Sequence, residues 1–126
     1  MYRVTKTMEI AGAHQLHLDY ESKCTNLHGH NWIITVTCES EHLDVNGMVI
    51  DFKLIKNRVA NMLDHQNLNE VGVFKELGIN PTAENIAHWI CNLVPYCVYV
   101  AVQESEGNLA EYFKPVETEE DNYCEG

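Results

Sequence analysis

Residues 28–38 most limit how this chain can fold, because apolar and polar side chains alternate along them. A period of two is typical of a strand that buries one face. The apolar members share one parity: Trp32, Ile34, Val36 and Cys38. His28 and His30 fall on the same parity at the end of this run. The pattern therefore predicts a strand that directs two imidazoles toward the interior of the protein.

The pair His28 and His30 could chelate a metal ion, or it could simply be a polar strand end. A catalytic zinc ion usually has three protein ligands and one open position, so this interpretation needs a third ligand. A strand expected over residues 2–10 leads into small residues and then His14, with His17 three positions later. Both His14 and His17 are candidates for the missing ligand.

The remaining elements predict an α+β fold class in the order β-β-α-α-β-β. We expect further strands over residues 98–104 and 109–113, and a short strand over residues 48–50 that closes a hairpin. One helix should follow Asp51 as N-cap, with an apolar stripe: Phe52, Ile55, Val59, Met62 and Leu63. A second helix should begin after Asn80 or Thr82 as N-cap and end at Pro95.

These elements predict one antiparallel sheet of four strands with both helices on one face. Residues 15–27 should form a loop across the top of the sheet, and residues 66–80 a second irregular stretch. We expect a single domain over residues 1–126, in which residues 114–126 are a short acidic tail that frays. The open sheet edges favour assembly into a homo-oligomer.

Composition excludes several classes of function. Of the 126 residues, 19 are acidic and 8 basic, and the resulting net charge of -11 disfavours nucleic-acid binding. No apolar run approaches the roughly 20 residues that cross a bilayer, so we expect no membrane span. Five cysteines without CxxC spacing, and a start without an apolar leader, favour a reduced cytoplasmic protein.

Three further positions have both a plain and a chemical interpretation. Cys24 could be a small surface residue, or a thiolate that the adjacent Lys23 and a nearby metal favour as a base or nucleophile. Asp64 and His65 could complement the charge of a helix end, or form a carboxylate-polarised acid and base. Glu104 ends an apolar strand face, where a carboxylate needs a ligand or a donor.

Taken together, several motifs over residues 2–113 resemble the 6-pyruvoyltetrahydropterin synthase and 6-carboxytetrahydropterin synthase family. They are Ala13-His14-x-Leu16, Cys24-x-x-x-His28-Gly29-His30, Gly47-Met48-Val49-Ile50-Asp51-Phe52, Leu63-Asp64-His65-x-x-Leu68-Asn69, Pro81-Thr82-Ala83-Glu84-Asn85-Ile86-Ala87, and Glu104 with Tyr112. The resemblance implies the tunnelling fold, in which trimers close a barrel and two trimers form a hexamer with active sites between subunits.

The resemblance also implies the roles of individual residues. Zn²⁺ would be held by His14, in preference to His17, together with His28 and His30. Cys24 would accept a proton, Asp64 and His65 would form a relay, and Glu104 would anchor a pterin. The implied substrate contacts also include Lys23, Thr82 and Glu84.

The implied substrate is 7,8-dihydroneopterin triphosphate. We expect the product 6-carboxy-5,6,7,8-tetrahydropterin, with release of acetaldehyde and triphosphate, in 7-deazaguanine and queuosine biosynthesis. The alternative is 6-pyruvoyltetrahydropterin synthase of tetrahydrobiopterin biosynthesis. Two other classes remain, a zinc hydrolase that would not need Cys24 and a non-catalytic zinc- or pterin-binding module.

Overall fold

The sheet is built on one long ribbon of two strands. In this computed structural model, which describes residues 1–116, β1 (Tyr2–His14) pairs antiparallel with β2 (His28–Ser40) over its whole length. β4 (Cys97–Ser105) pairs antiparallel with β2, and β5 (Asn108–Phe113) pairs antiparallel with β4. The alternation of side chains therefore continues across four strands, as the sequence predicts.

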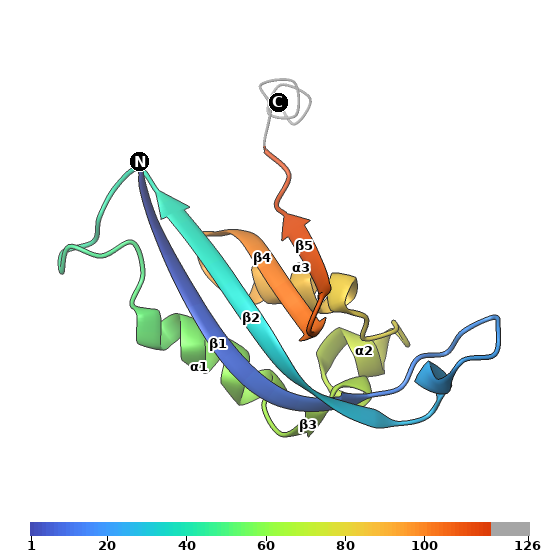
Figure 1. The fold of residues 1–126 in the computed structure, drawn as a ribbon. Coiled ribbons are helices and arrows are strands. Elements are labelled where there is room, and N and C mark those ends of the chain that lie inside the picture. The colour runs from blue at the N-terminus through green and yellow to red at the C-terminus, as the bar shows by residue number, and fades with distance from the viewer. Residues whose placement is uncertain (117–126) are drawn as a thin grey trace.

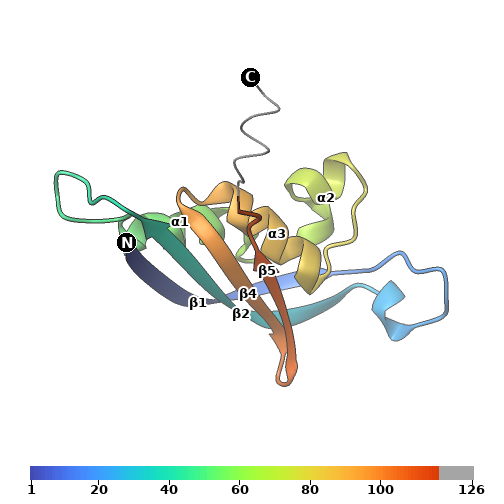
Figure 2. The same ribbon diagram turned by 90° about the horizontal axis from the view of Figure 1, so that it is seen from above.

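Helices cover one face of this sheet, on the side where the apolar parity of β2 is buried (Figures 1 and 2). They are α1 (Phe52–Leu63), the short α2 (Gly72–Glu76) and α3 (Ala83–Leu93). Trp32, Ile34 and Val36 have no exposed surface beneath them. None of the helices in the described part of the chain is long and apolar enough to cross a membrane.

The two predicted helix starts are found, and the structure decides between the alternative caps. The Asp51 side chain accepts a hydrogen bond from the backbone N–H of Lys53, and the Thr82 hydroxyl accepts one from that of Asn85. Thr82 is thus the N-cap of α3, and Asn80 is not. In α1 the inner stripe is narrower than predicted, because Phe52 is 49 % exposed and Met62 40 %.

The predicted strand over residues 48–50, and with it the hairpin, is wrong. The Asp44 carboxylate instead accepts hydrogen bonds from the N–H groups of Asn46 and Met48, and Gly47 adopts a left-handed φ of 80° between them. Val49 and Ile50 are buried without strand pairing. A short apolar run is compatible with a paired strand and with an irregular segment whose side chains are buried. Residues 48–50 belong to the second kind.

Residues 66–80 are more regular than predicted. They contain β3 (Gln66–Asn67), the 3-10 helix η2 (Leu68–Glu70) and α2. β3 pairs parallel with β1, so the sheet has five strands, in the order β3-β1-β2-β4-β5, and not four. A two-residue strand has no periodicity of its own to reveal it.

Residues 15–27 extend beyond the end of the β1–β2 ribbon and do not cross the sheet (Figures 1 and 2). They contain the 3-10 helix η1 (Lys23–Thr25), whose N-cap is Ser22. At the other end of the chain, most of the predicted acidic tail, from residue 117 onward, lies outside the described residues.

Gly72 provides a test of packing between α2 and α3. Its φ is +47°, and a Cβ built there would lie 2.4 Å from Cζ2 of Trp89. Gly72→Ala should therefore lower the free energy of unfolding by about 2–3 kcal/mol, combining overpacking with backbone strain. Gly78 has a similar φ of +65° but no atoms within 4 Å, so Gly78→Ala should cost only about 1 kcal/mol. Urea denaturation measures both, and equal losses would contradict the steric explanation.

Candidate metal centre

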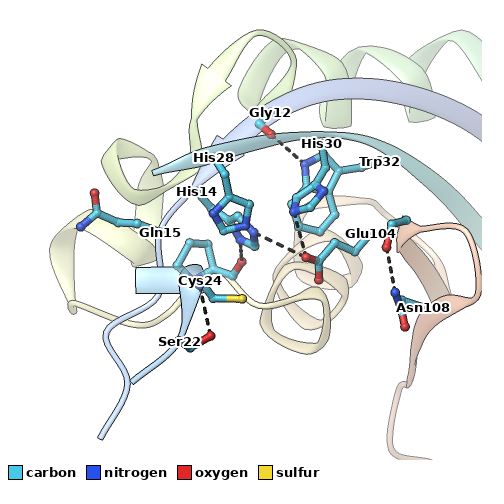
Figure 3. Close-up of polar contacts among 12 residues, drawn as sticks. Gly12, His14, Gln15, Ser22, Cys24, His28, His30, Trp32, Glu104 and Asn108 are labelled. Carbon is cyan, nitrogen blue, oxygen red and sulfur yellow. Dashed lines mark hydrogen bonds and ion pairs between the residues drawn. The ribbon is translucent and has the colours of Figure 1, made fainter. Parts of the chain in front are cut away.

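Three imidazoles meet at the end of the β1–β2 ribbon. The register pairs His14 with His28 and Gly12 with His30, so all three histidines lie on the helix-covered face. Their ring centroids are 4.5 Å (His14 and His28), 4.8 Å (His28 and His30) and 5.2 Å (His14 and His30) apart. Figure 3 shows the rings gathered around one space, which Glu104 enters from β4.

Backbone carbonyls orient two of the rings. Nδ1 of His14 lies 2.7 Å from the Pro81 carbonyl oxygen, and Nδ1 of His28 lies 2.7 Å from that of Asn26. A carbonyl can only accept, so each Nδ1 carries the proton and donates it. This tautomer leaves Nε2 with a free lone pair, which is the form that binds a metal ion.

His14 is the most buried of the three, at 1 % exposure. Burial lowers the pKa of its imidazole, and the nearby His28 and His30 act in the same direction, against the Pro81 hydrogen bond and Glu104. The ring is therefore neutral over a wider pH range than a free histidine. Nε2 of His14 and Nε2 of His30 are buried without a hydrogen-bond partner in the described residues.

Glu104 completes a group of four possible ligands, His14, His28, His30 and Glu104, whose ligand atoms all lie within 4.8 Å of one another. The register of β4 against β5 shifts between Gln103 and Ser105, which places Glu104 at an irregularity of the kind that redirects a side chain. Its Oε1 lies 2.9 Å from Nε2 of His30, without hydrogen-bond alignment, and 3.7 Å from Nε2 of His14. The group can hold a metal ion, and Glu104 is either a fourth ligand or a group beside it.

Cys24 and Lys23 lie on η1, at the far end of the loop that links β1 to β2. Cys24 is half-buried, and its backbone N–H donates to the Ser22 hydroxyl at 3.1 Å. In Figure 3 the Cys24 sulfur points away from the loop backbone toward the region between the histidines and Glu104. Lys23 is exposed beside it.

Asp64 and His65 follow α1 and lie against β1. Oδ1 of Asp64 accepts a hydrogen bond from the Ala11 N–H at 2.9 Å, and Oδ2 lies 3.6 Å from Nε2 of His65. His65 has a left-handed φ of 59°, and its N–H donates to the Ala11 carbonyl at 2.7 Å. The carboxylate is thus held in place next to an imidazole that is 82 % exposed.

His65 lies in a depression that is lined mainly, but not entirely, by the face of the ribbon opposite the helices. The depression has a volume of about 520 Å³ and is lined by positions that alternate with the three histidines (Ala11, Ala13, Gly29 and Asn31), but also by Gly12 and His30. Alternation places the first four of these positions on the face opposite the helices. Of the four possible ligands, His30 lines this depression with His65, whereas His14, His28 and Glu104 do not.

Of the other candidate residues, Glu84 lines a second depression with Glu104, of about 390 Å³. The Thr82 hydroxyl is engaged as the cap of α3. His17 is exposed and is not part of the four-residue group, and His42 and His88 are also exposed. Cys38, Cys91 and Cys97 are buried, and burial raises the pKa of the Cys91 thiol to about 12, which fits packing residues.

Sequence reasoning missed the groups that surround the ligands. The Trp32 ring stands edge-on to His14 and His30, at centroid distances of 4.9 and 5.2 Å, and its Nε1 donates to the Gly12 carbonyl. The parity that placed the histidines could have identified Trp32 as the floor of the site. The carbonyls of Pro81 and Asn26 carry no side-chain signal, so the sequence could not have indicated them.

Comparisons with known proteins were made on both sequence and structure. The family described as 6-pyruvoyl tetrahydropterin synthase matches residues 3–115. The 6-carboxy-5,6,7,8-tetrahydropterin synthase of Synechocystis sp. is 36% identical over 129 residues, covering 91% of this chain and 95% of that protein. The enzyme of the same name from Rickettsia bellii is 33% identical over 105 residues, covering 69% and 75%.

A solved structure, that of Caenorhabditis elegans 6-pyruvoyl tetrahydropterin synthase, superposes on this chain with a TM-score of 0.72 at 26% sequence identity. The match covers 90% of this chain and 96% of that one. The α+β architecture, with helices on one face of the sheet, is therefore the tunnelling fold that the sequence motifs imply.

The histidine cluster predicts a metal site that depends on His28. Loss of a residue that only hydrogen-bonds to a metal ligand lowers metal affinity roughly 10–100-fold. His28→Ala removes a ligand itself, so it should lower Zn²⁺ affinity by more than this. His17→Ala is the matched control, because His17 was the alternative ligand and lies outside the cluster. Zinc content after equilibrium dialysis, measured by atomic emission, gives the result. Equal zinc in the two variants would contradict the ligand set.

Proposed function

We propose that this chain, which belongs to the 6-pyruvoyl tetrahydropterin synthase family, is a zinc-dependent lyase acting on 7,8-dihydroneopterin triphosphate. The proposed products are 6-carboxy-5,6,7,8-tetrahydropterin, acetaldehyde and triphosphate, within 7-deazaguanine and queuosine biosynthesis in the cytoplasm. The observation that carries the proposal is the group of three histidines and Glu104 with free Nε2 atoms. The names of the Synechocystis and Rickettsia relatives favour the carboxy product.

The residues present fit a zinc ion. His14, His28 and His30 would hold it through Nε2, since Nδ1 of His14 and of His28 is engaged by a carbonyl and burial keeps His14 neutral. When bound, zinc would supply a Lewis acid that polarises the hydroxyl oxygens of the substrate side chain. Glu104 lies close enough to neutralise part of the charge in this space.

Two groups would move protons to and from the substrate side chain. Cys24 would accept a proton from carbon as a thiolate, which suits its half-buried position beside the cation Lys23. His65 would donate and accept protons on the other side of the substrate, and Asp64 would hold the His65 imidazole in one orientation. Elimination of triphosphate would follow proton removal, because the negative charge left on carbon expels the neighbouring phosphate oxygen.

This division of roles requires more than one subunit. Within one chain His65 shares a depression with only one of the possible ligands, His30, so the His65 that completes a given site would come from a neighbouring copy. The sheet has two outer strands, β5 on one side and the two-residue β3 on the other. Edge-to-edge joining of these strands would supply that neighbour. We propose a homohexamer, a dimer of trimers, with active sites between subunits.

Glu104 would anchor the pterin ring. The 2-amino group and N3–H of a pterin form a donor pair that matches the two oxygens of a carboxylate. Glu104 opens into the depression that it shares with Glu84, next to the metal ligands, so a ring held there would present its side chain to the zinc site. Lys23, Thr82 and Glu84 are the proposed further substrate contacts.

The second candidate function is 6-pyruvoyl tetrahydropterin synthase, which the superposition on the Caenorhabditis elegans enzyme favours. Both reactions begin with the same substrate and lose triphosphate. They differ in whether the two outer carbons leave as acetaldehyde or stay on the product. A non-catalytic zinc- or pterin-binding module is the remaining alternative, and any turnover excludes it.

Product analysis tests the proposal. Incubation of the zinc-loaded protein with 7,8-dihydroneopterin triphosphate should release acetaldehyde and triphosphate in equal amounts, measured by mass spectrometry after derivatisation. Cys24→Ala should retain zinc and lose at least roughly 100-fold in turnover, the lower range for loss of a general base. A product that keeps its side chain without acetaldehyde would establish the second candidate. Turnover of Cys24→Ala within a few-fold of the wild type would refute its role as base.

The anchoring role of Glu104 gives a separate prediction. Glu104→Gln keeps the shape but turns one acceptor into a donor that faces a donor, so pterin affinity should fall at least roughly tenfold, about 1.4 kcal/mol. Zinc content and assembly should be unchanged. Calorimetric titration with sepiapterin measures the affinity, and Glu106→Gln, at an exposed carboxylate outside this depression, serves as the matched control. Loss of zinc from Glu104→Gln would instead make Glu104 a metal ligand.

A further inference from the structure

Two asparagine side chains hold the segment that follows β1. The Asn69 amide accepts from the Gln15 N–H at 2.8 Å and donates to the Gln15 carbonyl at 2.9 Å. The Asn80 amide accepts from the His17 N–H at 2.8 Å and donates to the His17 carbonyl at 3.0 Å. Each side chain thus exchanges a pair of hydrogen bonds with one residue, as a neighbouring strand would.

The other edge of this segment is bonded to Cys24. Gln15 and His17 point their backbone groups to one side, and Leu16 between them points to the other. There the Leu16 N–H donates to the Cys24 carbonyl at 2.8 Å. Residues 15–17 therefore form a short extended segment, with two amide side chains on one edge and Cys24 on the other.

Few other interactions hold Cys24 in place within the loop between β1 and β2. Most residues between Leu18 and His28 are exposed, namely Asp19, Tyr20, Glu21, Lys23, Thr25, Asn26 and Leu27. Apolar burial therefore contributes little to the position of η1. Among the described hydrogen bonds, the one from the Leu16 N–H joins the Cys24 backbone to the part of the chain outside η1 and its N-cap.

Asn80 also connects this segment to the metal centre. Its carbonyl accepts from the Asn85 side chain at 2.9 Å, which fixes it at the start of α3. The next residue, Pro81, supplies the carbonyl that orients His14. One stretch of backbone therefore places both the imidazole of His14 and, through His17 and Leu16, the loop that carries Cys24.

We propose that Asn69 and Asn80 form an amide clamp, a pair of positioning residues that sets the place of the Cys24 thiol relative to the metal ligands. The proposal rests on the proposed role of Cys24 as proton acceptor. No described hydrogen bond joins either asparagine side chain to the four possible ligands, so we expect loss of the clamp to act on the chemical step through the loop that carries Cys24. A displacement of about 1 Å is enough to cost roughly 100-fold in rate when a catalytic group must meet its target at close range.

The test compares the double variant Asn69→Ala/Asn80→Ala with the wild type and with Asn92→Ala, an exposed asparagine on α3. Backbone hydrogen exchange in peptides covering residues 15–25 should become at least tenfold faster in the double variant only. Exchange in β4 should not change. This measurement does not depend on turnover, so it tests the clamp even if the proposed reaction is wrong.

Kinetics then tests what the clamp does. With 7,8-dihydroneopterin triphosphate, the double variant should lose at least tenfold in kcat, while KM and zinc content stay within twofold of the wild type. In the Cys24→Ala background the same two substitutions should cause no further loss, because they act through Cys24. Unchanged hydrogen exchange, a fall in zinc content that accounts for the lost rate, or an equal additional loss in the Cys24→Ala background would each overturn the proposal. Absence of turnover by the wild type would overturn the reaction and leave the exchange result standing.

Discussion

The candidate site depends on the pairing register of β1 and β2. The register pairs His14 with His28 and Gly12 with His30. This pairing puts three imidazoles on one face, with ring centroids 4.5–5.2 Å apart. A slip of one residue would send the His14 side chain to the other face and separate it from its partners. The register is fixed locally by Trp32, whose indole donates to the Gly12 carbonyl and has no exposed surface. A Cβ on residue 12 would lie 3.3 Å from that indole nitrogen. Glycine at position 12 therefore leaves the space that the Trp32 ring occupies.

The same arrangement creates a polar site that the protein alone does not satisfy. Two imidazole nitrogens are buried without hydrogen-bond partners among the described residues, and each such atom costs about 1–3 kcal/mol. Burial also lowers the pKa of His14, so protonation does not relieve the cost at neutral pH. A bound cation would satisfy these lone pairs at once. The energetic penalty in the folded chain and the proposed affinity for a metal ion would therefore have one origin, which is the convergence of Nε2 atoms in a space bordered by Trp32 and Glu104.

Much of this could be predicted from the sequence, and the failures share a physical cause. Period-two alternation located β1, β2, β4 and β5, and it placed His28, His30 and Glu104 on the inner face because a strand has only two faces. The choice of His14 over His17 came from a family resemblance, and the structure places His14, but not His17, in the group of four possible ligands. What could not be predicted depends on contacts distant in sequence. Val49 and Ile50 are buried without pairing, β3 exists only because β1 offers a free edge, and the carbonyl that orients His14 comes from Pro81, 67 residues away.

The separation of His65 from the histidine cluster follows from the same alternation. The possible metal ligands face the helices, and residues one position away belong to the other face; Asp64 and His65 attach to β1 there through the backbone of Ala11. His65 has a left-handed φ of 59°, a conformation that residues other than glycine adopt only at a few positions. Because β5 and β3 leave both outer edges of the sheet available for pairing, a neighbouring copy could bring its own His65 toward the metal ligands of the first. The unpaired sheet edges and the distance of His65 from most of the cluster would then have one explanation, the proposed assembly of several chains.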